Sequence, residues 1–415
     1  MKHLNNIFKA IYHLLIVFLT CFLTFSTVSA ATTPAEGQTV ADSAAQAMDS
    51  VEVSLLTCQP HDEVYSLYGH TALRWHDTRQ QGADLAFNYG VFDFSAPHFV
   101  TRFVFGITDY ELGVYSYGLF RREYEYFGSM VTEQVLNLTN EEKLRLQAAL
   151  ADNLKPENRV YRYNYFYNNC TSKARDIIEQ CLTAQLQYAE DTAEAVSWRQ
   201  MVREMTANSP WAQFGNDFLL GIAADSKTTQ RQRQFLPHRL MYDFDRAQIR
   251  RGDSLLPLVK ERRIAVPAGV QLIQDGFPLS PSQCAWLLTA IATVLTALQW
   301  RRKKTFLAWD LLLMAAIGIM GLLLTLMLFS QHPTVRLNLQ YILLNPLPWL
   351  FLWPVARRRQ TAYWTITVML AVLFLAGGLL QSYAEGIWSI GVAMLLQGCL
   401  HIYLKGKELN TKGKA

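Results

Sequence analysis

Cys170 and His70 stand in the two contexts of this sequence that best suit nucleophilic catalysis. Cys170 follows a polar Tyr-Asn-Asn run, and apolar positions in residues 174–182 then recur at helical intervals. The cysteine is therefore expected at or near a helix N-terminus, with Asn168 or Asn169 as the cap. Unpaired backbone N–H groups and the helix dipole favour a thiolate there, which makes Cys170 a candidate nucleophile. The alternative is an inert, small apolar residue.

A thiol nucleophile needs a base, and His70 has the best context among the histidines. It lies in the segment YGHTAL (68–73), where Gly69 permits close backbone approach and the following residues alternate as a strand. Such a strand can hold the imidazole rigidly. The alternative is a half-buried histidine on a sheet with no chemical role. The other histidines expected outside the membrane are His61, His76, His98 and His238.

A metal site made of His61, His70 and His76 is a weaker alternative. Neither interval between these residues places two ligands on one helix face or in one tight loop. We therefore expect no metal ion and no cofactor.

The residues around this pair predict a mixed α+β domain. Short β-branched and aromatic runs at 51–56, 71–77 and 85–94, separated by polar or glycine breaks, predict strands. Thr139 and Glu142 form a capping box that starts a helix ending near Leu154. The tyrosine-rich segment 159–166, which precedes Cys170, is strand-like.

The N-terminus predicts export. Residues 1–30 have a basic start, an apolar run and small residues before a cleavage site, which are typical of a secretory signal. Residues 31–49 are predicted to form a flexible tether. Of the six cysteines, only Cys58, Cys170 and Cys181 lie outside the signal and the apolar spans. Because three is odd, at least one free thiol or an intermolecular bond is expected; a bridge between Cys58 and Cys181 is conceivable.

The composition argues against an ordinary cytosolic enzyme. Charged residues make up 17% of the 415, against about 25% in soluble globular proteins, and the deficit is concentrated between Gln283 and Tyr403. Five apolar runs are each long enough to cross a bilayer. They are Cys284 to Trp300, Phe306 to Ser330, Leu337 to Val355, Ala362 to Tyr383 and Ile387 to Leu404.

The basic residues fall at alternate ends of these runs. Clusters follow the first run (301–304), the third (357–359) and the fifth (405–414), whereas the other loops hold only Arg336 and Glu385. By the positive-inside rule the C-terminus is cytoplasmic and the residues before Cys284 are extracytoplasmic, in agreement with the signal peptide. We therefore attribute the net charge of +4 to the basic residues that set the orientation in the membrane. No nucleic-acid partner is expected.

A few polar residues lie in or beside the apolar runs. Asp310 most simply pairs with the adjacent basic cluster, and His332 lies in a short outer loop at the level of the lipid headgroups. Asn338 begins the third run. Asn345-Pro346 and Pro348 interrupt that run and predict a broken helix.

Seven stretches together resemble one bacterial family. YSLYGHTALRW, FNYGVFDF, FVTRFVFGITDYELGVYSY, LNLTNEEKLRLQAAL and YRYNYFYNNCTSKARDII resemble the exported domain of the Lnb-type lipoprotein N-acyltransferases. FLAWDLLLMAAIGIMGLLL and SQHPTVRLNLQYILLNPL resemble the membrane domain of that family. The resemblance covers most of the chain from Val51 onward, and it rests on the ordered combination of both halves.

The resemblance implies a fold and a site. The soluble domain looks like a circularly permuted papain-type (NlpC-like) fold with the histidine on a strand before the cysteine, as in lecithin:retinol acyltransferase, and an all-α domain of five transmembrane helices follows. His70 and Cys170 match the family's pair. Asn88, Asp93, His98 and Asn169 are candidates for an orienting or oxyanion-binding role, and His332 and Asn338 are candidate substrate contacts on the membrane side.

The implied activity is acyl transfer at the bacterial inner membrane. A membrane phospholipid would donate an acyl chain through a Cys170 thioester to the α-amine of a diacylglyceryl-cysteine on a lipoprotein. The expected division is a signal peptide (1–30), a tether (31–49), a periplasmic thiol acyltransferase domain (50–282), a transmembrane domain (283–404) and a cytoplasmic tail (405–415).

Two other functions remain open from the sequence. A membrane-anchored thiol peptidase or amidase acting on cell wall would use the same pair, but it needs only one anchor. A module without catalytic activity would use the aromatic segment from Tyr161 to Tyr167 to bind a glycan or a partner.

Overall fold

The computed structural model describes residues 46–191, 194–271, 276–359 and 362–412. Met1–Ser50 and Val51–Ala415 are separate compact units. The expected signal peptide and most of the expected tether lie outside the described residues. Within the first unit, the backbone N–H of Asp49 donates to the carbonyl of Gln46 at 3.1 Å.

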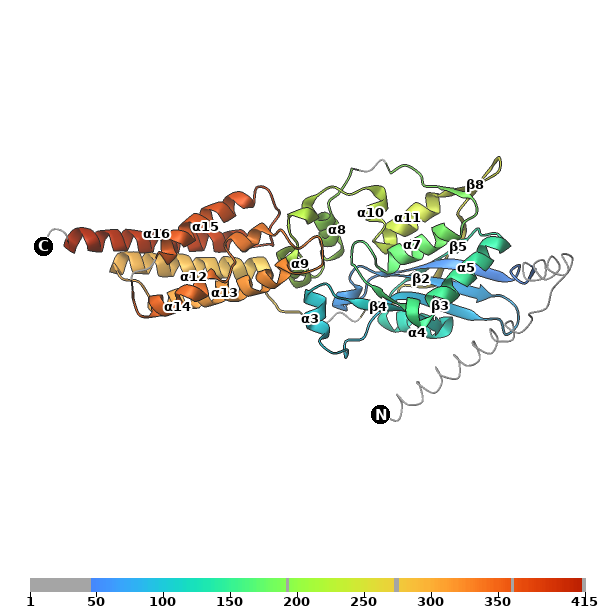
Figure 1. The fold of residues 1–415 in the computed structure, drawn as a ribbon, viewed down its shortest axis with the longest axis horizontal. Helices are drawn as coiled ribbons and strands as arrows, with labels where there is room; N and C mark the ends of the chain where they lie inside the picture. Colours follow the sequence, from blue (N-terminus) through green and yellow to red (C-terminus); the bar gives the residue numbers. More distant parts are fainter. Residues whose placement is uncertain (1–45, 192–193, 272–275, 360–361, 413–415) are drawn as a thin grey trace, which may run out of the picture. The chain divides into compact units, whose positions relative to one another are not determined.

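A seven-stranded sheet is the framework of the N-terminal part of the second unit (Figure 1), and each pair of neighbouring strands is antiparallel. The strand order is β10-β5-β1-β2-β3-β4-β6. The strands are β1 (Val51–Cys58), β2 (His70–Asp77), β3 (Asp84–Val91), β4 (Asp109–Ser116), β5 (Val131–Leu136), β6 (Val160–Arg162) and β10 (Val259–Val266). The predictions for 51–56 and 71–77 are confirmed as β1 and β2, and the prediction for 85–94 is confirmed as β3 up to Val91, beyond which 92–94 lie outside the strand. The register places Cys58 opposite His70.

Helices cover both faces of this sheet. In Figure 1, α5 (Asn140–Asn153), α7 (Cys170–Cys181) and α11 (Pro237–Arg246) lie over one face and α4 (Tyr117–Phe127) lies under the other. Both predicted N-termini are confirmed: Thr139 and Glu142 form the capping box of α5, and Asn169 caps α7.

The prediction of a strand over 159–166 is mostly wrong. Only Val160–Arg162 pairs, as β6, after the short helix α6 (Pro156–Arg159). The chain then turns because the side chain of Asn164 accepts the backbone N–H groups of Phe166 and Tyr167, each at 3.2 Å. This turn delivers the chain to the start of α7.

Residues 187–276 are not assigned to any element by the sequence patterns above, and in the structure they complete the soluble part. They contain α8 (Trp198–Met205), α9 (Pro210–Leu219), η2 (Ile222–Asp225), α10 (Gln230–Arg233), β8 (Gln248–Arg251) and β9 (Ser254–Pro257) besides α11 and β10. The strands β8 and β9 form a small sheet with β7 (Gln185–Gln187). Hydrogen bonds join the end of α9 to the membrane part: the N–H groups of Gly221 and Ile222 donate to Thr334 and Leu337 at 2.7 and 2.8 Å.

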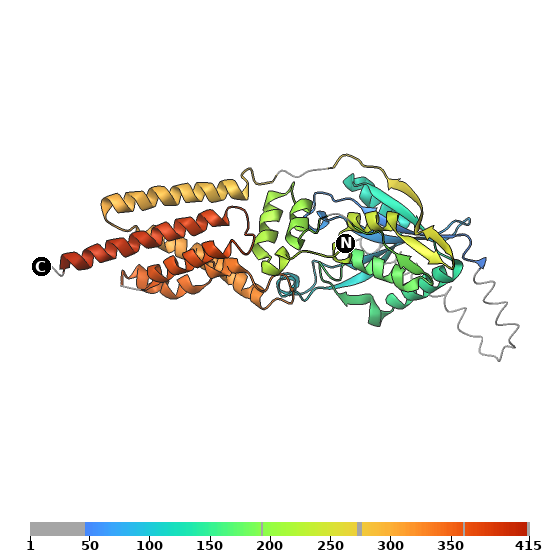
Figure 2. The ribbon, with the colours of Figure 1, turned by 90° about the horizontal axis from the view of Figure 1, so that it is seen from above.

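A helical part follows, with a helix in each of the five apolar runs. The helices are α12 (Pro281–Arg302), α13 (Leu307–Leu328), α14 (Leu347–Ala356), α15 (Tyr363–Gly377) and α16 (Ile387–Lys412). Among the described residues three stretches are long and apolar enough to span a membrane, namely α12, α13 and Ile387–Lys407 of α16, whereas α14 and α15 have only 10 and 15 residues. In Figures 1 and 2 α16 runs beside α15 and α12.

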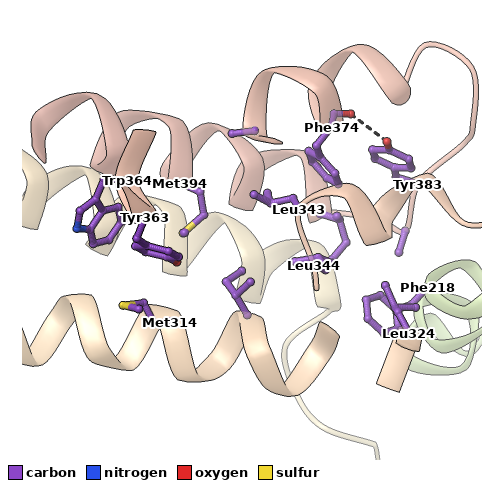
Figure 3. Close-up of a cluster of buried hydrophobic side chains, with 14 of the residues drawn as sticks. Phe218, Met314, Leu324, Leu343, Leu344, Tyr363, Trp364, Phe374, Tyr383 and Met394 are labelled. Atoms are coloured by element: carbon purple, nitrogen blue, oxygen red, sulfur yellow. Dashed lines mark hydrogen bonds between the residues drawn. The ribbon is translucent and has the colours of Figure 1, made fainter. Parts of the chain in front are cut away.

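The predicted break in the third run is present. A short 3₁₀ helix, η3 (Leu339–Ile342), precedes α14, and Pro346 caps the latter. Figure 3 shows Leu343 and Leu344 from this break packed among side chains of the surrounding helices, including Met314, Phe374 and Met394. The break therefore places apolar side chains in the centre of the bundle.

Asp310 does not pair with the adjacent basic cluster as expected. Its carboxylate lies 3.0 Å from Nε2 of His401 and accepts a hydrogen bond from Gln397 at 2.8 Å. Asp310 is 1% exposed, and a buried carboxylate requires such partners nearby. The interaction joins α13 to α16.

Candidate active site

Cys170 is the first residue of α7 and is buried, with 8% of its surface exposed. The side chain of Asn169 accepts the N–H of Ser172 at 2.9 Å, and the hydroxyl of Ser172 accepts the N–H of Asn169 at 2.8 Å. This reciprocal cap fixes the helix start. The Cys170 thiol consequently lies where the helix presents unpaired N–H groups.

His70 is the first residue of β2, and the next residues of the two elements, Thr71 and Thr171, are joined by a hydrogen bond of 3.0 Å between their hydroxyls. The imidazole is close enough to the Cys170 thiol to lower its pKa. The chain enters β2 through Gly69 with φ +75°, and a Cβ there would lie 2.6 Å from the carbonyl oxygen of Cys58. Only glycine avoids both the left-handed strain and this clash. Gly69 thus sets the position from which His70 reaches Cys170.

Asn88 is the orienting candidate whose side chain meets His70. Its Oδ1 lies 3.1 Å from Nε2 of His70, and its Nδ2 donates to the carbonyl of Ala86 at 3.4 Å. Asn88 is on β3, next to β2, and is 6% exposed. Its amide is therefore held by the sheet, and it limits rotation of the imidazole.

The electrostatics of the pair favour the ionised form. Burial alone would raise the pKa of the Cys170 thiol, but the charge and hydrogen bond of His70, a Thr71 backbone N–H and the Thr171 hydroxyl together hold it below its usual value. Burial alone would lower the pKa of His70, yet Cys170 and the hydrogen bond that the imidazole donates to Asn88 raise it. Each partner thus stabilises the charged state of the other.

The pH dependence of Cys170 alkylation should reveal this coupling. We expect the iodoacetamide reaction of the full-length protein, followed at each cysteine by mass spectrometry, to reach half its maximal rate at Cys170 below pH 9.0, the ordinary thiol pKa. His70→Ala should move that midpoint upward because burial then dominates, and Asn88→Ala should move it part of the way.

Cys181 is an internal control in the same spectra. Burial raises the pKa of its thiol, so it should react only at higher pH, and its profile should be the same in all three proteins. An unchanged Cys170 midpoint in His70→Ala would contradict the pairing.

The other orienting or oxyanion candidates lie elsewhere or have other partners. Asp93 and His98 are exposed, in the segment after β3. The Asp93 carboxylate accepts the N–H and hydroxyl of Ser95, at 2.8 and 2.6 Å. His98 precedes α3 (Phe99–Val104) with φ 58°. The Asn169 amide serves as the helix cap and donates to the carbonyl of Phe235 at 2.8 Å.

His332 and Asn338 both lie where the membrane part meets the soluble part. The ring of His332 lies 6.3 Å from that of Phe103, and burial lowers the pKa of its imidazole. Asn338 is 6% exposed; it donates to the carbonyl of Phe218 at 2.8 Å and accepts from Gln381 at 2.9 Å. These bonds give Asn338 a role in joining the two parts.

The remaining histidines and cysteines lie in other surroundings. His61 stacks on Phe127 at 4.0 Å, and His76 lies 3.9 Å from Glu52. Burial lowers the pKa of His238 to about 4. Within the described ranges no group of three or more His, Cys, Asp and Glu side chains is arranged to hold a metal ion. Cys58, Cys170 and Cys181 are free thiols, so the conceivable bridge is not formed.

Sequence reasoning missed several residues that surround the thiol. Gly90 is in the left-handed region with φ +89°, and a Cβ there would lie 3.7 Å from Cβ of Cys170 and 3.4 Å from the ring of Tyr163. The Tyr161 hydroxyl is buried and donates to no group in the described part of the chain. The clue in the sequence was the tyrosine run before Cys170. Tyr161 and Tyr163 therefore lie around the candidate nucleophile Cys170.

Comparison with known families agrees with both parts of the molecule. Residues 40–204 match the model of the Lnb N-terminal periplasmic domain, and residues 273–409 match that of the Lnb transmembrane domain. No curated protein and no solved structure matches the chain. With a periplasmic domain followed by a transmembrane domain, both of the Lnb type and in that order, the chain is a membrane protein that belongs to the Lnb-type family.

Proposed function

We propose that this protein is a lipoprotein N-acyltransferase with Cys170 as nucleophile and His70 as general base and acid. The observation that carries the proposal is the buried Cys170 thiol at a helix start, held beside the strand of a histidine that a buried asparagine positions and whose charge lowers the pKa of the thiol. Membership of the Lnb-type family supports an enzyme of this kind.

The first half-reaction forms a thioester. The Cys170 thiolate attacks an ester carbonyl of a membrane phospholipid, and a C–S bond forms as the carbonyl becomes an oxyanion. The N–H of Cys170 and the hydroxyl of Tyr161, which has no hydrogen-bond partner among the described residues, are candidate donors to that charge. As the oxyanion collapses, the C–O bond to glycerol breaks and the His70 imidazolium protonates the leaving lysophospholipid alkoxide.

The second half-reaction transfers the acyl chain. The α-amine of a diacylglyceryl-cysteine attacks the thioester, and His70 takes the amine proton. A C–N bond forms, the C–S bond breaks, and the thiolate and imidazolium are restored together. The raised pKa of His70 and the lowered pKa of Cys170 suit this cycle because both charges return at its end.

The proposed function implies an architecture for the whole chain. The thiol domain (50–282) is a permuted papain-like domain in the periplasm, and five transmembrane helices (283–404) hold it at the inner membrane with the tail (405–415) in the cytoplasm. Residues 1–30 are the signal peptide, and 31–49 form the tether. Because both substrates are confined to the bilayer, anchoring raises their effective concentration at the site.

The full-length protein in vesicles tests the reaction directly. With phosphatidylethanolamine carrying a labelled acyl chain and a diacylated lipopeptide, we expect the label on the lipopeptide α-amine and one lysophospholipid for each acyl chain moved. A lipopeptide with a blocked α-amine should remain unlabelled. Cleavage of cell-wall peptides with no N-terminal acylation would instead support the thiol peptidase.

A further inference from the structure

A cavity of about 340 Å³ lies next to the candidate active site, within the range of about 300–1,000 Å³ typical of small-molecule sites. Its apolar wall includes Val91, Phe92, Phe99, Phe103, Ile107 and Tyr110. Val91 directly follows Gly90, which lies against Cys170, and the ring of Tyr110 packs at 4.4 Å on that of Tyr163 beside the thiol. The cavity wall at Val91 is therefore one residue along β3 from the position that lies against Cys170.

The chain around Phe105 and Gly106, between cavity-wall residues Phe103 and Ile107, contacts the outer loop of the membrane part. The backbone N–H of Gln331 donates to the carbonyl of Phe105 at 2.9 Å, and a Cβ at Gly106 would lie 3.0 Å from the backbone nitrogen of His332. This loop directly follows α13, one of the helices long enough to span a bilayer. The cavity consequently opens beside a segment that stands at the membrane surface.

Exposed apolar side chains surround the cavity. Phe94, Val100 and Phe103 are 63%, 73% and 49% exposed. The ring of Phe94 lies 4.7 Å from that of Phe92 and 5.1 Å from that of Phe99, so the exposed rings continue into the cavity wall. Large aromatic side chains exposed next to a membrane-spanning part are typical of contact with the headgroup region.

Two arginines share one carboxylate at this cavity. The guanidinium groups of Arg102 and Arg162 both bind Asp109, and Arg162 also donates to Gln331 at 2.8 Å. Arg102 and Asp109 line the cavity, and the two arginine side chains are 41% and 46% exposed. Because one carboxylate neutralises only one guanidinium, the cluster keeps one positive charge that an anion can approach.

The other charges of the cavity are balanced or negative. Glu111 is paired with Arg159 at 2.8 Å, and Asp93 is exposed and accepts hydrogen bonds from Ser95. The excess positive charge is thus confined to the cluster of Arg102, Asp109 and Arg162, while Asp93 offers a carboxylate in the same cavity. This arrangement suits a zwitterionic lipid headgroup with a phosphate and an ammonium group.

The geometry points to this cavity as the binding site of the donor phospholipid, with its phosphate at Arg102 and Arg162 and part of an acyl chain against the aromatic wall. The assignment of the bound lipid as the acyl donor rests on the proposed function, but the assignment of a lipid site to this cavity does not. A phosphate held at this cluster would anchor the lipid beside Gly90 and Cys170. The acceptor, a diacylglyceryl-cysteine, has no phosphate and does not need the two arginines.

A binding experiment tests the site independently of the reaction. Full-length Cys170→Ser protein in nanodiscs is exposed to phosphatidylethanolamine with a photoactivatable acyl chain, and the crosslinked peptides are mapped by mass spectrometry. We expect crosslinks within residues 91–110, and we expect Arg102→Gln with Arg162→Gln to reduce them about tenfold. Crosslinks confined to α12–α16 would overturn the inference whether or not the protein transfers acyl chains.

A kinetic experiment tests the role of the lipid as donor. In the wild-type background, the double arginine variant should raise the apparent KM for phosphatidylethanolamine about tenfold and leave the KM for the lipopeptide unchanged. Arg145→Gln, which removes a solvent-exposed arginine paired with Glu141 on α5, is the control and should change neither. Equal increases in both KM values would contradict a donor-specific site, and crosslinks at 91–110 without any acyl transfer would contradict the proposed function alone.

Discussion

Replacing Cys170 by serine should reduce acyl transfer by roughly 10⁴-fold or more, the scale at which loss of a nucleophile acts in enzymes with covalent intermediates. A serine hydroxyl stays protonated beside His70, whereas the present surroundings hold the pKa of the thiol below its usual value. The rate of lipopeptide N-acylation in vesicles measures the loss. Without acceptor, the wild-type protein should also accumulate an acyl group on Cys170 that hydroxylamine removes, and the variant should accumulate none.

Cys181→Ser is the matched control because it makes the same atomic change at the other end of α7. Cys181 is a free thiol and is 4% exposed, and burial raises its pKa, so it resembles Cys170 in burial but not in its ionisation. We expect the control to keep transfer within a few-fold of the wild type. Near-normal transfer by Cys170→Ser would exclude this thiol as the nucleophile, and equal losses in both variants would indicate a structural effect of the substitution.

The sequence predicted the starts of α5 and α7 because their signals are local. A capping residue and its partner lie three positions apart, as Thr139 and Glu142 do, and the bonds they form depend on little else. The position of Cys170 at a helix start followed directly from such a signal. By contrast, the tyrosine run after β6 looked like a strand, and the turn made by Asn164 became visible only in three dimensions.

The orienting residue could not be chosen from the sequence. Asn88, Asp93 and His98 lie within eleven positions of one another, and all can form hydrogen bonds with an imidazole. Only the pairing of β2 with β3 brings Asn88 within 3.1 Å of His70. The pairing of Asp310 with His401 was hidden for the same reason, since these residues are far apart in the chain.

Arg199→Met should destabilise the protein by about 3–5 kcal/mol, the usual cost of leaving a buried charge without its partner. Arg199 is 1% exposed and binds Asp217 at 3.1 Å and Asp225 at 2.8 Å. It also donates to the carbonyls of Leu220 and Gly221, at the turn that meets the membrane part. Thermal unfolding of the full-length protein in detergent should show a melting temperature lower by roughly 6–20 °C.

Arg145→Met is the control for this change. Arg145 is paired with Glu141 on the surface of α5, and the two side chains are 52% and 65% exposed, so its loss should cost about 0–1 kcal/mol. A similarly small effect of Arg199→Met would show that the buried ion pairs do not support this junction.

The pH dependence of the stability difference between Arg199→Met and the wild type identifies the buried charge that causes that difference. Burial already raises the pKa of Asp217 above its usual value of 3.8 despite Arg203 and Arg199, and removal of Arg199 should raise it further. A carboxyl whose pKa is raised on folding stabilises the folded state when protonated and loses that contribution as the pH rises through the folded-state value. The deficit of Arg199→Met relative to the wild type should therefore be largest near neutral pH and shrink as acid protonates Asp217. A deficit that is constant with pH would mean that lost packing, and not the unpaired carboxylate, weakens the junction.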